Sequence, residues 1–337
     1  MCVKSFRDTR SPCFSKNEKV FALGVMLLLV GVVALASSAC MSMAEERFSQ
    51  EVAVDKGTEL QVETQNGQVV VEVGGEGKVR VGGKKRVRAL TGASGMLGDI
   101  KIKVEKKEGK LQVGAEHPKS SFTENYSVSF ALSVPRATPL RLLSRNGSIR
   151  VEGTKGRIWV ETRNGSVKLR KVEGNVEVTT KNGSVKVSGR IPAMKLTTRN
   201  GSIKASSSSS SSASSSSGSK GAALGRISLN TNNGSIRYRG KASQLRVKSR
   251  NGSVKVQLEE GSKLSSDGIV KTKNGSVKVT LPKSFSCALE AKTSNGRIRS
   301  DFDLESKGKK RISGTLGQGG AKLSIETRNG SIRLQKR

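Results

Sequence analysis

The sequence contains a single histidine, His117, which stands next to Pro118 in a polar stretch. General acid–base and metal sites built on histidine need a carboxylate or further ligands beside it, so His117 alone gives no catalytic signal. The motifs GxSxG and HExxH and the phosphate-binding loop are also missing. We therefore expect neither a serine hydrolase nor a zinc protease nor a nucleotide-binding enzyme.

Cysteine, proline and aromatic residues are scarce as well. The 4 cysteines form no CxxC pair and no metal spacing, so we expect no metal, no cofactor and no disulfide framework. Aromatic residues make up 3% of the chain and hydrophobic residues 34%, too little for a compact globule with one central core. Only 6 prolines stand against 38 glycines, which indicates turns built on glycine. An elongated fold with a narrow aliphatic core is expected.

Acidic residues are few relative to basic ones. The sequence has 61 Lys and Arg against 27 Asp and Glu, a formal net charge of +34. Such a surface attracts polyanions, including anionic lipid and acidic polysaccharide. We expect no nucleic acid partner, because single-strand binding needs aromatic stacking platforms among the basic residues, and Tyr238 points inward by its position.

The N-terminus has the pattern of an export signal. Basic residues precede the apolar run "VFALGVMLLLVGVVALA", which is followed by the small residues "SSAC". We assign residues 1–39 to a signal peptide or uncleaved membrane anchor and residues 40–47 to a linker. Cys40 after Ser38-Ala39 resembles a lipoprotein cleavage box, although Ser37 stands where such boxes usually have Leu. The sequence thus predicts an exported, membrane-attached protein of the cell envelope, periplasmic or surface-exposed.

The remainder is dominated by a repeat around Asn-Gly, as in "TRNGS" at residues 162–166. The repeated turn asparagines are Asn66, Asn146, Asn164, Asn182, Asn200, Asn233, Asn251, Asn274, Asn295 and Asn329. From Asn146 to Asn200 the step is 18 residues, and the next step of 33 contains the 15-residue tract "SSSSSSSASSSSGSK", so that 33 − 15 = 18. This tract, residues 206–220, is predicted to be a disordered insertion that leaves the register intact.

Apolar residues alternate on both sides of each Asn-Gly pair. Positions six and four before the asparagine and three and five after it are mostly Val, Ile or Leu, and the position two before is always Thr or Ser. This period of two predicts strands with one apolar face, joined at Asn-Gly because glycine accepts positive φ. An antiparallel meander of Asn-Gly hairpins satisfies the pattern. A single-stranded β-solenoid with coils of about 18 residues explains the identity of equivalent positions better.

The exported part, about residues 48–337, resembles the Toastrack family, a domain-of-unknown-function family of adhesin-type bacterial proteins. The resemblance rests on "LQVETQNGQVVVEV", on "YSVSFALSVPRATPLRLLSRNGSIRVEG" and on the coils that follow. It implies a right-handed β-helix-like fold, adhesion or association with membrane-stress proteins, and no catalytic residues. We expect an irregular β-rich region at residues 48–140 and regular solenoid repeats at 141–337.

Basic residues recur at two outward positions of the repeat. They stand one before the asparagine or four after it, and in a solenoid each set would form a column along the Asn-Gly edge. The predicted anionic-ligand residues are Arg145, Arg150, Arg163, Lys168, Lys181, Lys186, Arg199, Lys204, Arg237, Arg250, Lys255, Lys273, Lys278, Arg299, Arg328 and Arg333. The hypothesis is that this edge binds an anionic envelope polymer or lipid surface. The alternative is that the cations maintain solubility and block strand pairing at the surface.

The sequence therefore predicts a non-catalytic binding or scaffold module. The runner-up is a polysaccharide-active enzyme of the β-helix type, for which the only clustered carboxylates are Asp301, Asp303 and Glu305. Their alternation with Phe302 and Leu304 places all three on the outer face, which is typical of a solvated surface. The sequence names no ligand and no oligomeric state.

Overall fold

In a computed structural model, which describes residues 42–119, 123–208, 225–306 and 308–337, the chain is a stack of β-coils. The predicted signal segment and Cys40 lie outside the described residues. The described residues form 27 strands and two short 3-10 helices, η1 (Gly95–Asp99) and η2 (Gly308–Lys310). No helix within the described ranges is long and apolar enough to cross a membrane.

Each coil consists of two strands joined at an Asn-Gly corner. The strand before the corner belongs to one sheet, called sheet B. Its parallel strands, in spatial order, are β6 (Lys110–Glu116), β2 (Glu59–Asn66), β8 (Leu140–Asn146), β10 (Ile158–Asn164), β12 (Val176–Asn182), β14 (Ala193–Asn200), β16 (Arg226–Asn233), β18 (Gln244–Asn251), β20 (Gly268–Asn274), β26 (Lys322–Asn329) and β22 (Cys287–Asn295). Antiparallel strands β5 (Lys101–Lys107), β25 (Arg311–Leu316) and β24 (Glu305–Ser306) complete its two ends.

The strand after the corner belongs to the second sheet, sheet A. Its parallel strands, in spatial order, are β7 (Glu124–Val134), β3 (Val69–Val73), β9 (Ile149–Glu152), β11 (Val167–Glu173), β13 (Val185–Arg190), β15 (Ile203–Ser207), β17 (Ile236–Gly240), β19 (Val254–Leu258), β21 (Val277–Leu281), β27 (Ile332–Lys336) and β23 (Ile298–Ser300). Antiparallel strands β4 (Lys78–Ala89) and β1 (Ser42–Ala53) extend it at the N-terminal end.

The coils stack in parallel and in register. Asn164 of β10 pairs with Asn146 of β8 on one side and with Asn182 of β12 on the other, and sheet A keeps the same register across the corner. The β-solenoid prediction is confirmed. The alternative of an antiparallel meander is wrong, because the strands on either side of each Asn-Gly pair lie in different sheets and pair with the next coils.

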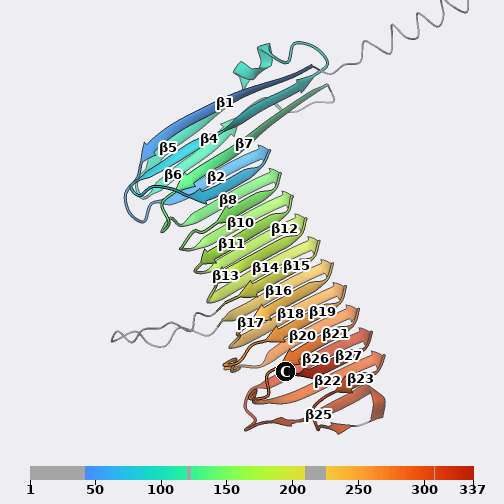
Figure 1. The fold of residues 1–337 in the computed structure, drawn as a ribbon. Helices are drawn as coiled ribbons and strands as arrows, with labels where there is room; N and C mark the ends of the chain where they lie inside the picture. The colour runs from blue at the N-terminus through green and yellow to red at the C-terminus, as the bar shows by residue number, and fades with distance from the viewer. Residues whose placement is uncertain (1–41, 120–122, 209–224, 307) are drawn as a thin grey trace, which may run out of the picture.

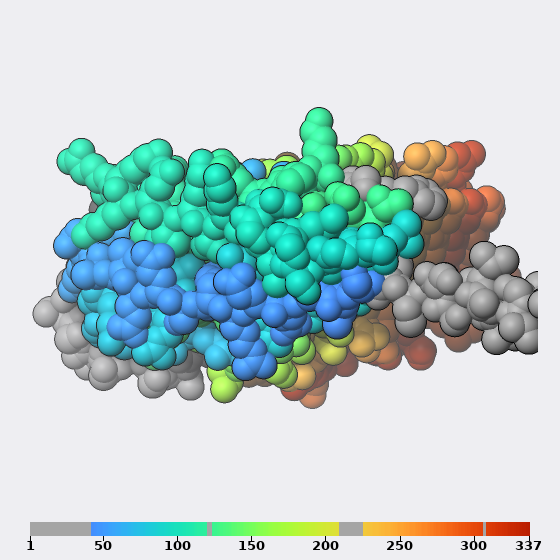
Figure 2. All heavy atoms as spheres, turned by 90° about the horizontal axis from the view of Figure 1, so that it is seen from above, coloured from blue at the N-terminus to red at the C-terminus, as the bar shows by residue number. Residues whose placement is uncertain are grey.

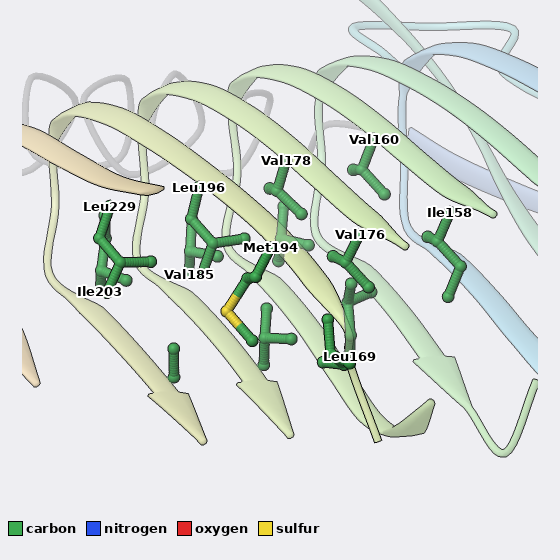
Figure 3. Packing of buried hydrophobic residues seen from close by; sticks show 14 of the residues in the cluster. Ile158, Val160, Leu169, Val176, Val178, Val185, Met194, Leu196, Ile203 and Leu229 are labelled. Atoms are coloured by element: carbon green, nitrogen blue, oxygen red, sulfur yellow. The ribbon is translucent and has the colours of Figure 1, made fainter. Parts of the chain in front are cut away.

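The apolar rows meet between the two sheets (Figure 3). Val160, Val178, Leu196 and Leu229 form one continuous row, each with its side chain fully or almost fully buried. Residues of sheet A such as Ile203 face them from the other side. Burying each such side chain contributes about 1.5–3 kcal/mol, and each coil adds several of them to the narrow core.

The N-terminal region differs from the prediction. The first coil begins at β2, and Asn66 pairs with Asn146, so the stack starts far before residue 141. Residues 74–139 form an excursion from this coil, whose long strands β4 and β7 continue sheet A. Strand β1 begins at Ser42, inside the segment assigned to a linker. Figure 2 shows the blue and cyan residues of this region lying over the end of the stack.

The C-terminal coil does not lie at the end of the stack. Strands β26 and β27 lie between the coil of β20 and β21 and the coil of β22 and β23 (Figure 1). The coil of β22 and β23 is therefore the last one in the stack, although the coil of β26 and β27 follows it in sequence. Strand β25 turns back antiparallel onto β22 and closes the end of sheet B.

The serine-rich tract interrupts the chain without interrupting the stack. Strand β14 pairs with β16 across it, and Asn200 stands in register with Asn233 as the spacing predicted. Ser206 and Ser207 belong to β15 and pair with β13. Residues 209–224 lie outside the described residues, so the predicted disorder of most of this insertion stays a prediction.

Candidate functional site

The asparagine side chains of the corners form one continuous hydrogen-bonded ladder. In each coil the Asn Nδ2 donates to the Oδ1 of the Asn in the preceding coil of the stack, at 2.7 or 2.8 Å. The ladder runs from Asn66 through Asn329 to Asn295. At its first end Asn66 donates to the carbonyl of Tyr126. All amide dipoles therefore point the same way along one edge, called here the Asn-Gly edge.

The backbone of the edge is fixed by the same stacking. Each corner glycine packs so closely that a Cβ on Gly183 would lie 2.0 Å from the carbonyl oxygen of Gly165. Most of the buried Thr or Ser residues two before the asparagine donate to such a glycine carbonyl, as Thr198 does to Gly183 at 3.1 Å. Because glycine and hydroxyl recur together, the corners cannot shift relative to one another.

Two columns of cations flank this edge, one on the outer face of each sheet. On sheet A, the residues four after each asparagine pair in register from coil to coil. This sheet A column consists of Arg150, Lys168, Lys186, Lys204, Arg237, Lys255, Lys278, Arg333 and Arg299, in that spatial order. It is uninterrupted over nine coils, and neighbouring strands lie about 4.8 Å apart.

The second column stands one residue before each asparagine on sheet B. This sheet B column consists of Arg145, Arg163, Lys181, Arg199, Arg250, Lys273 and Arg328, all of them exposed. Asn232 interrupts it, and Gln65 and Ser294 end it. The structure thus brings the predicted cations together as two columns on opposite sheets, with the asparagine ladder between them.

None of the sixteen cations forms an ion pair with a described residue. The salt bridges of the described ranges use other cations, for example Lys195 with Glu177 at 2.7 Å and Lys271 with Glu326 at 2.5 Å. The reason lies in the repeat, because neither column contains an Asp or Glu, whereas the ion-paired positions three and five before the asparagine carry both signs. The two columns therefore hold charge that the described part of the chain leaves uncompensated.

A long groove runs beside the sheet B column. It has a volume of about 890 Å³ and extends from β2 to β16. One ridge consists of the column residues Arg145, Arg163, Lys181 and Arg199, and the other carries Glu63, Leu143, Glu161, Thr179, Thr197 and Asn230. Its direction follows the stack, so a chain-like ligand would meet a similar set of groups at each coil.

Sequence reasoning missed this groove, which follows the buried Thr and Ser residues two before each asparagine, between the two outward rows. It also missed the contact of Trp159 with Arg141, whose guanidinium lies 4.4 Å from the ring centroid. The sequence did contain a signal for this contact. Arg141 and Trp159 both stand five residues before a turn asparagine, so they lie on one face in adjacent coils.

Several other residues with reactive or acidic side chains contribute neither to the two columns nor to the groove. Asp301, Asp303 and Glu305 are exposed near the C-terminal end, and no group of three or more His, Cys, Asp or Glu side chains within the described ranges is arranged to hold a metal ion. His117 stacks on Tyr126 with ring centroids 5.6 Å apart. Cys287 is buried, and burial raises the pKa of its thiol to about 11.

Tyr238 is the one tyrosine inside the regular repeats, and it is buried as expected. Its hydroxyl donates to the carbonyl of Lys241 at 2.7 Å and lies 3.0 Å from Ser207 Oγ. Burial raises the pKa of Tyr238 to about 12, and the Ser207 hydrogen bond offsets part of that shift. Tyr238 therefore acts as a core residue and not as a surface contact.

Comparison with known proteins adds the family. The family model Toastrack DUF4097 matches residues 57–335. No curated protein matches the sequence at a significant level. A crystal structure described as "a putative adhesin" from Bacteroides fragilis shares 11% identity, covering 87% of this chain and 97% of that chain with a TM-score of 0.38.

Two further crystal structures from Parabacteroides distasonis are similar. One, described as a "putative adhesin", has 10% identity, covers 86% of this chain and 97% of that chain, and has a TM-score of 0.38. The other, described as a "Putative lipid binding protein", has 12% identity, covers 86% of this chain and 96% of that chain, and has a TM-score of 0.31. At such identities the ligands of those proteins have no bearing on this chain.

Proposed function

The chain belongs to the Toastrack DUF4097 family, and from this premise we propose that it is a non-catalytic, adhesin-like module of the cell envelope that binds a linear anionic polymer along its Asn-Gly edge. The observation that carries the proposal is the set of sixteen cations in two columns, none of which forms an ion pair within the described residues. Like charges at this spacing repel one another by roughly 1 kcal/mol in water before salt screening. A bound polyanion removes that cost.

The shape of the columns favours a polymer over a small anion. The sheet A column presents one cation per coil along a straight line, and the groove beside the sheet B column runs in the same direction. A chain with a carboxylate, phosphate or sulfate on each unit can engage several cations at once, and the gain from each contact then adds along the chain. Export to the envelope and attachment through residues 1–40 belong to the same proposal.

The absence of a catalytic role is also a proposal. The three carboxylates considered for an enzyme, Asp301, Asp303 and Glu305, are exposed, and Asp301 Oδ2 accepts a hydrogen bond from the backbone N–H of Lys336 at an N–O distance of 3.4 Å. The groove beside the sheet B column is lined by cations, hydroxyls and isolated carboxylates. The association with membrane-stress proteins that the family resemblance implies stays a prediction.

Salt-dependent binding tests the proposal. Heparin and polygalacturonate serve as sulfated and carboxylated polymers, and vesicles of phosphatidylglycerol serve as an anionic lipid surface. We expect affinity for the polymers to fall steeply as salt rises, with a slope that reports the number of cations in contact. Stronger binding to the vesicles than to either polymer would assign the edge to a lipid surface, and flat or absent binding to all three probes would remove the proposal.

Two sets of substitutions with equal charge change locate the contact. The first changes Lys168, Lys186 and Lys204 of the sheet A column to Gln. The control changes Lys195, Lys271 and Lys322 to Gln, which removes three cations that pair with Glu177, Glu326 and Glu290. The column variant should lower the salt slope by about one unit per lost contact, and the control should leave it nearly unchanged. Equal losses in both variants would mean that only net charge matters.

A corresponding variant of the sheet B column, with Arg163, Lys181 and Arg199 changed to Gln, shows which face holds the polymer. If the polymer lies in the groove, this variant loses more affinity than the sheet A variant. If it lies on sheet A, the order is reversed.

A further inference from the structure

The ten Asn-Gly pairs are identical in type but not in environment. In nine of them the glycine N–H donates to the asparagine carbonyl of the next coil, as Gly165 does to Asn182 at 2.9 Å. In the same nine the asparagine Oδ1 accepts a hydrogen bond from the next asparagine of the ladder. For Asn295-Gly296, neither bond forms with any residue that the structure describes.

The reason is the position of this corner in the stack. Asn295 ends β22, which is the last parallel strand of sheet B, and Ile298 begins β23, which is the edge strand of sheet A. Strand β25 pairs with β22 but only up to Lys292, so it stops short of the corner. Ile298 is accordingly half-buried, whereas the residues at its position in the other coils are buried. At the opposite end the corner is covered, because Asn66 donates to Tyr126 and Gly67 donates to Asn146.

Asn-Gly is a reactive pair because glycine adds no side chain that obstructs its own nitrogen. The Gly nitrogen loses its proton and attacks the Asn Cγ, so that a C–N bond forms, the Cγ–Nδ2 bond breaks and ammonia leaves. Water then opens the resulting succinimide at either carbonyl and gives Asp or isoaspartate. The only co-reactants are water and hydroxide, and no electrons are transferred.

We propose that Asn295-Gly296 is a site of spontaneous deamidation in the folded protein and that the ladder protects the other nine pairs. Reaction in a protected pair must first break three hydrogen bonds. One is donated by the glycine N–H, and the other two are made by the asparagine side chain. At Asn295 the donation to Asn329 Oδ1, at 2.8 Å, is the only one of these hydrogen bonds formed with a described residue. The nitrogen that attacks and the carboxamide that is attacked are both held less firmly there.

Deamidation would change the open end of the stack. A carboxylate is an acceptor only, so residue 295 could no longer donate to Asn329. The product also places a negative charge in the coil that carries Arg299, the last cation of the sheet A column. The modification therefore loosens the terminal coil and lowers the charge of the adjoining column end, while the interior coils stay unchanged.

Peptide mapping tests this on the full folded chain after incubation in mildly alkaline buffer. Trypsin releases Asn295 in the distinctive peptide TSNGR, whereas Asn164, Asn182, Asn251 and Asn274 all appear in one shared peptide, NGSVK. We expect the fraction of Asp and isoaspartate to grow about tenfold faster in TSNGR than in NGSVK, which corresponds to about 1.4 kcal/mol in the barrier. A sample digested without incubation gives the background of both peptides.

The same incubation in denaturant separates structure from local sequence. In the unfolded chain no ladder exists, so the two peptides should deamidate at similar rates and the ratio should fall toward one. Equal rates in the folded chain would overturn the proposal. A ratio that stays the same in denaturant would overturn it as well, because the residues around Asn295 and not the fold would then set the rate.

Discussion

Asn329 lies directly on Asn274, 55 residues earlier in the chain, and its Nδ2 donates to the Asn274 Oδ1 at 2.8 Å. The same Asn329 accepts from Asn295, which precedes it in sequence but follows it in the stack. The final coil is thus inserted between two coils that were synthesised before it. The coil of β22 and β23, which ends the stack, can pack in its place only after β26 and β27 have been made. The folding of residues 287–316 therefore depends on residues 322–336.

This dependence predicts the effect of removing the C-terminal coil. A chain ending at Gly320 should lose hydrogen-exchange protection over residues 287–316, although none of these residues is deleted. Strand β22 pairs in parallel only with β26, and the remaining pair of β22 and β25 is too small to be stable alone. Residues 140–281 should keep their protection. A chain lacking only Arg337 is the control, and retained protection of β22 in the longer truncation would contradict the prediction.

Much of the fold could be predicted from the sequence, because a parallel stack repeats its requirements at fixed positions. The step of 18 residues and the alternation around each Asn-Gly pair predicted the register, even across the serine-rich tract from Asn200 to Asn233. The order of the last coils could not be predicted, since matching strands can stack in either order. One signal was present: Gln68 and Arg297 replace the serine after glycine in two of the ten copies, and these are the first and last corners of the stack.

The candidate site was predictable to a similar degree. The period of two along each strand predicted which Lys and Arg side chains face outward. The in-register stacking of the coils then lines these side chains up as columns. The lack of ion pairs at the column cations was harder to predict. It depends on where the acidic residues of neighbouring coils lie, and these, such as Glu177 beside Lys195, stand at other positions of the repeat. The step of 80 residues from Asn66 to Asn146 indicated an irregular region there, but it did not predict the long antiparallel strands of the excursion at residues 74–139, which belong to no repeat.

The close approach of the corners predicts a severe effect of Gly183→Ala. The added Cβ would lie 2.0 Å from the Gly165 carbonyl oxygen, and the stacked backbone cannot retreat without breaking the ladder on both sides. We expect a loss of about 3 kcal/mol or more in the free energy of unfolding, measured by denaturant titration. Gly98→Ala in η1 is the matched control, since nothing lies within 4 Å of its Cβ position. Similar losses of unfolding free energy in both variants would show that the close contact with the Gly165 carbonyl is not the cause.

The buried phenol of Tyr238 predicts an alkaline loss of stability. Burial raises its pKa in the folded state to about 12, above the ordinary value of about 10 for tyrosine, so the folded chain binds the proton more tightly than the unfolded chain does. The stabilisation of the folded state by the protonated phenol is complete below pH 10. It is lost as the pH rises toward about 12, and the total loss is roughly 3 kcal/mol. Tyr238→Phe has no such proton, so its unfolding free energy should fall less over this range. Parallel pH profiles of the two proteins would contradict the assignment.

The sheet A column predicts that one substitution will change stability and binding in opposite directions. Lys186 stands between Lys168 and Lys204 in adjacent strands and has no ion pair within the described residues. Lys186→Gln removes two like-charge contacts. Because flexible side chains can hold their charges farther apart than the strands, the free energy of unfolding should rise by only a few tenths of a kcal/mol at low salt, and this gain should vanish at high salt.

The same substitution should weaken heparin binding, because it removes one cation from the middle of the column. The control is Lys195→Gln, which breaks an ion pair with Glu177 and should neither stabilise the fold nor weaken binding appreciably. Natural sequences retain destabilising charge where a ligand requires it, since selection acts on function above a stability threshold. A Lys186→Gln protein that is no more stable than the parent at low salt would show that the column carries no repulsion for a polymer to relieve.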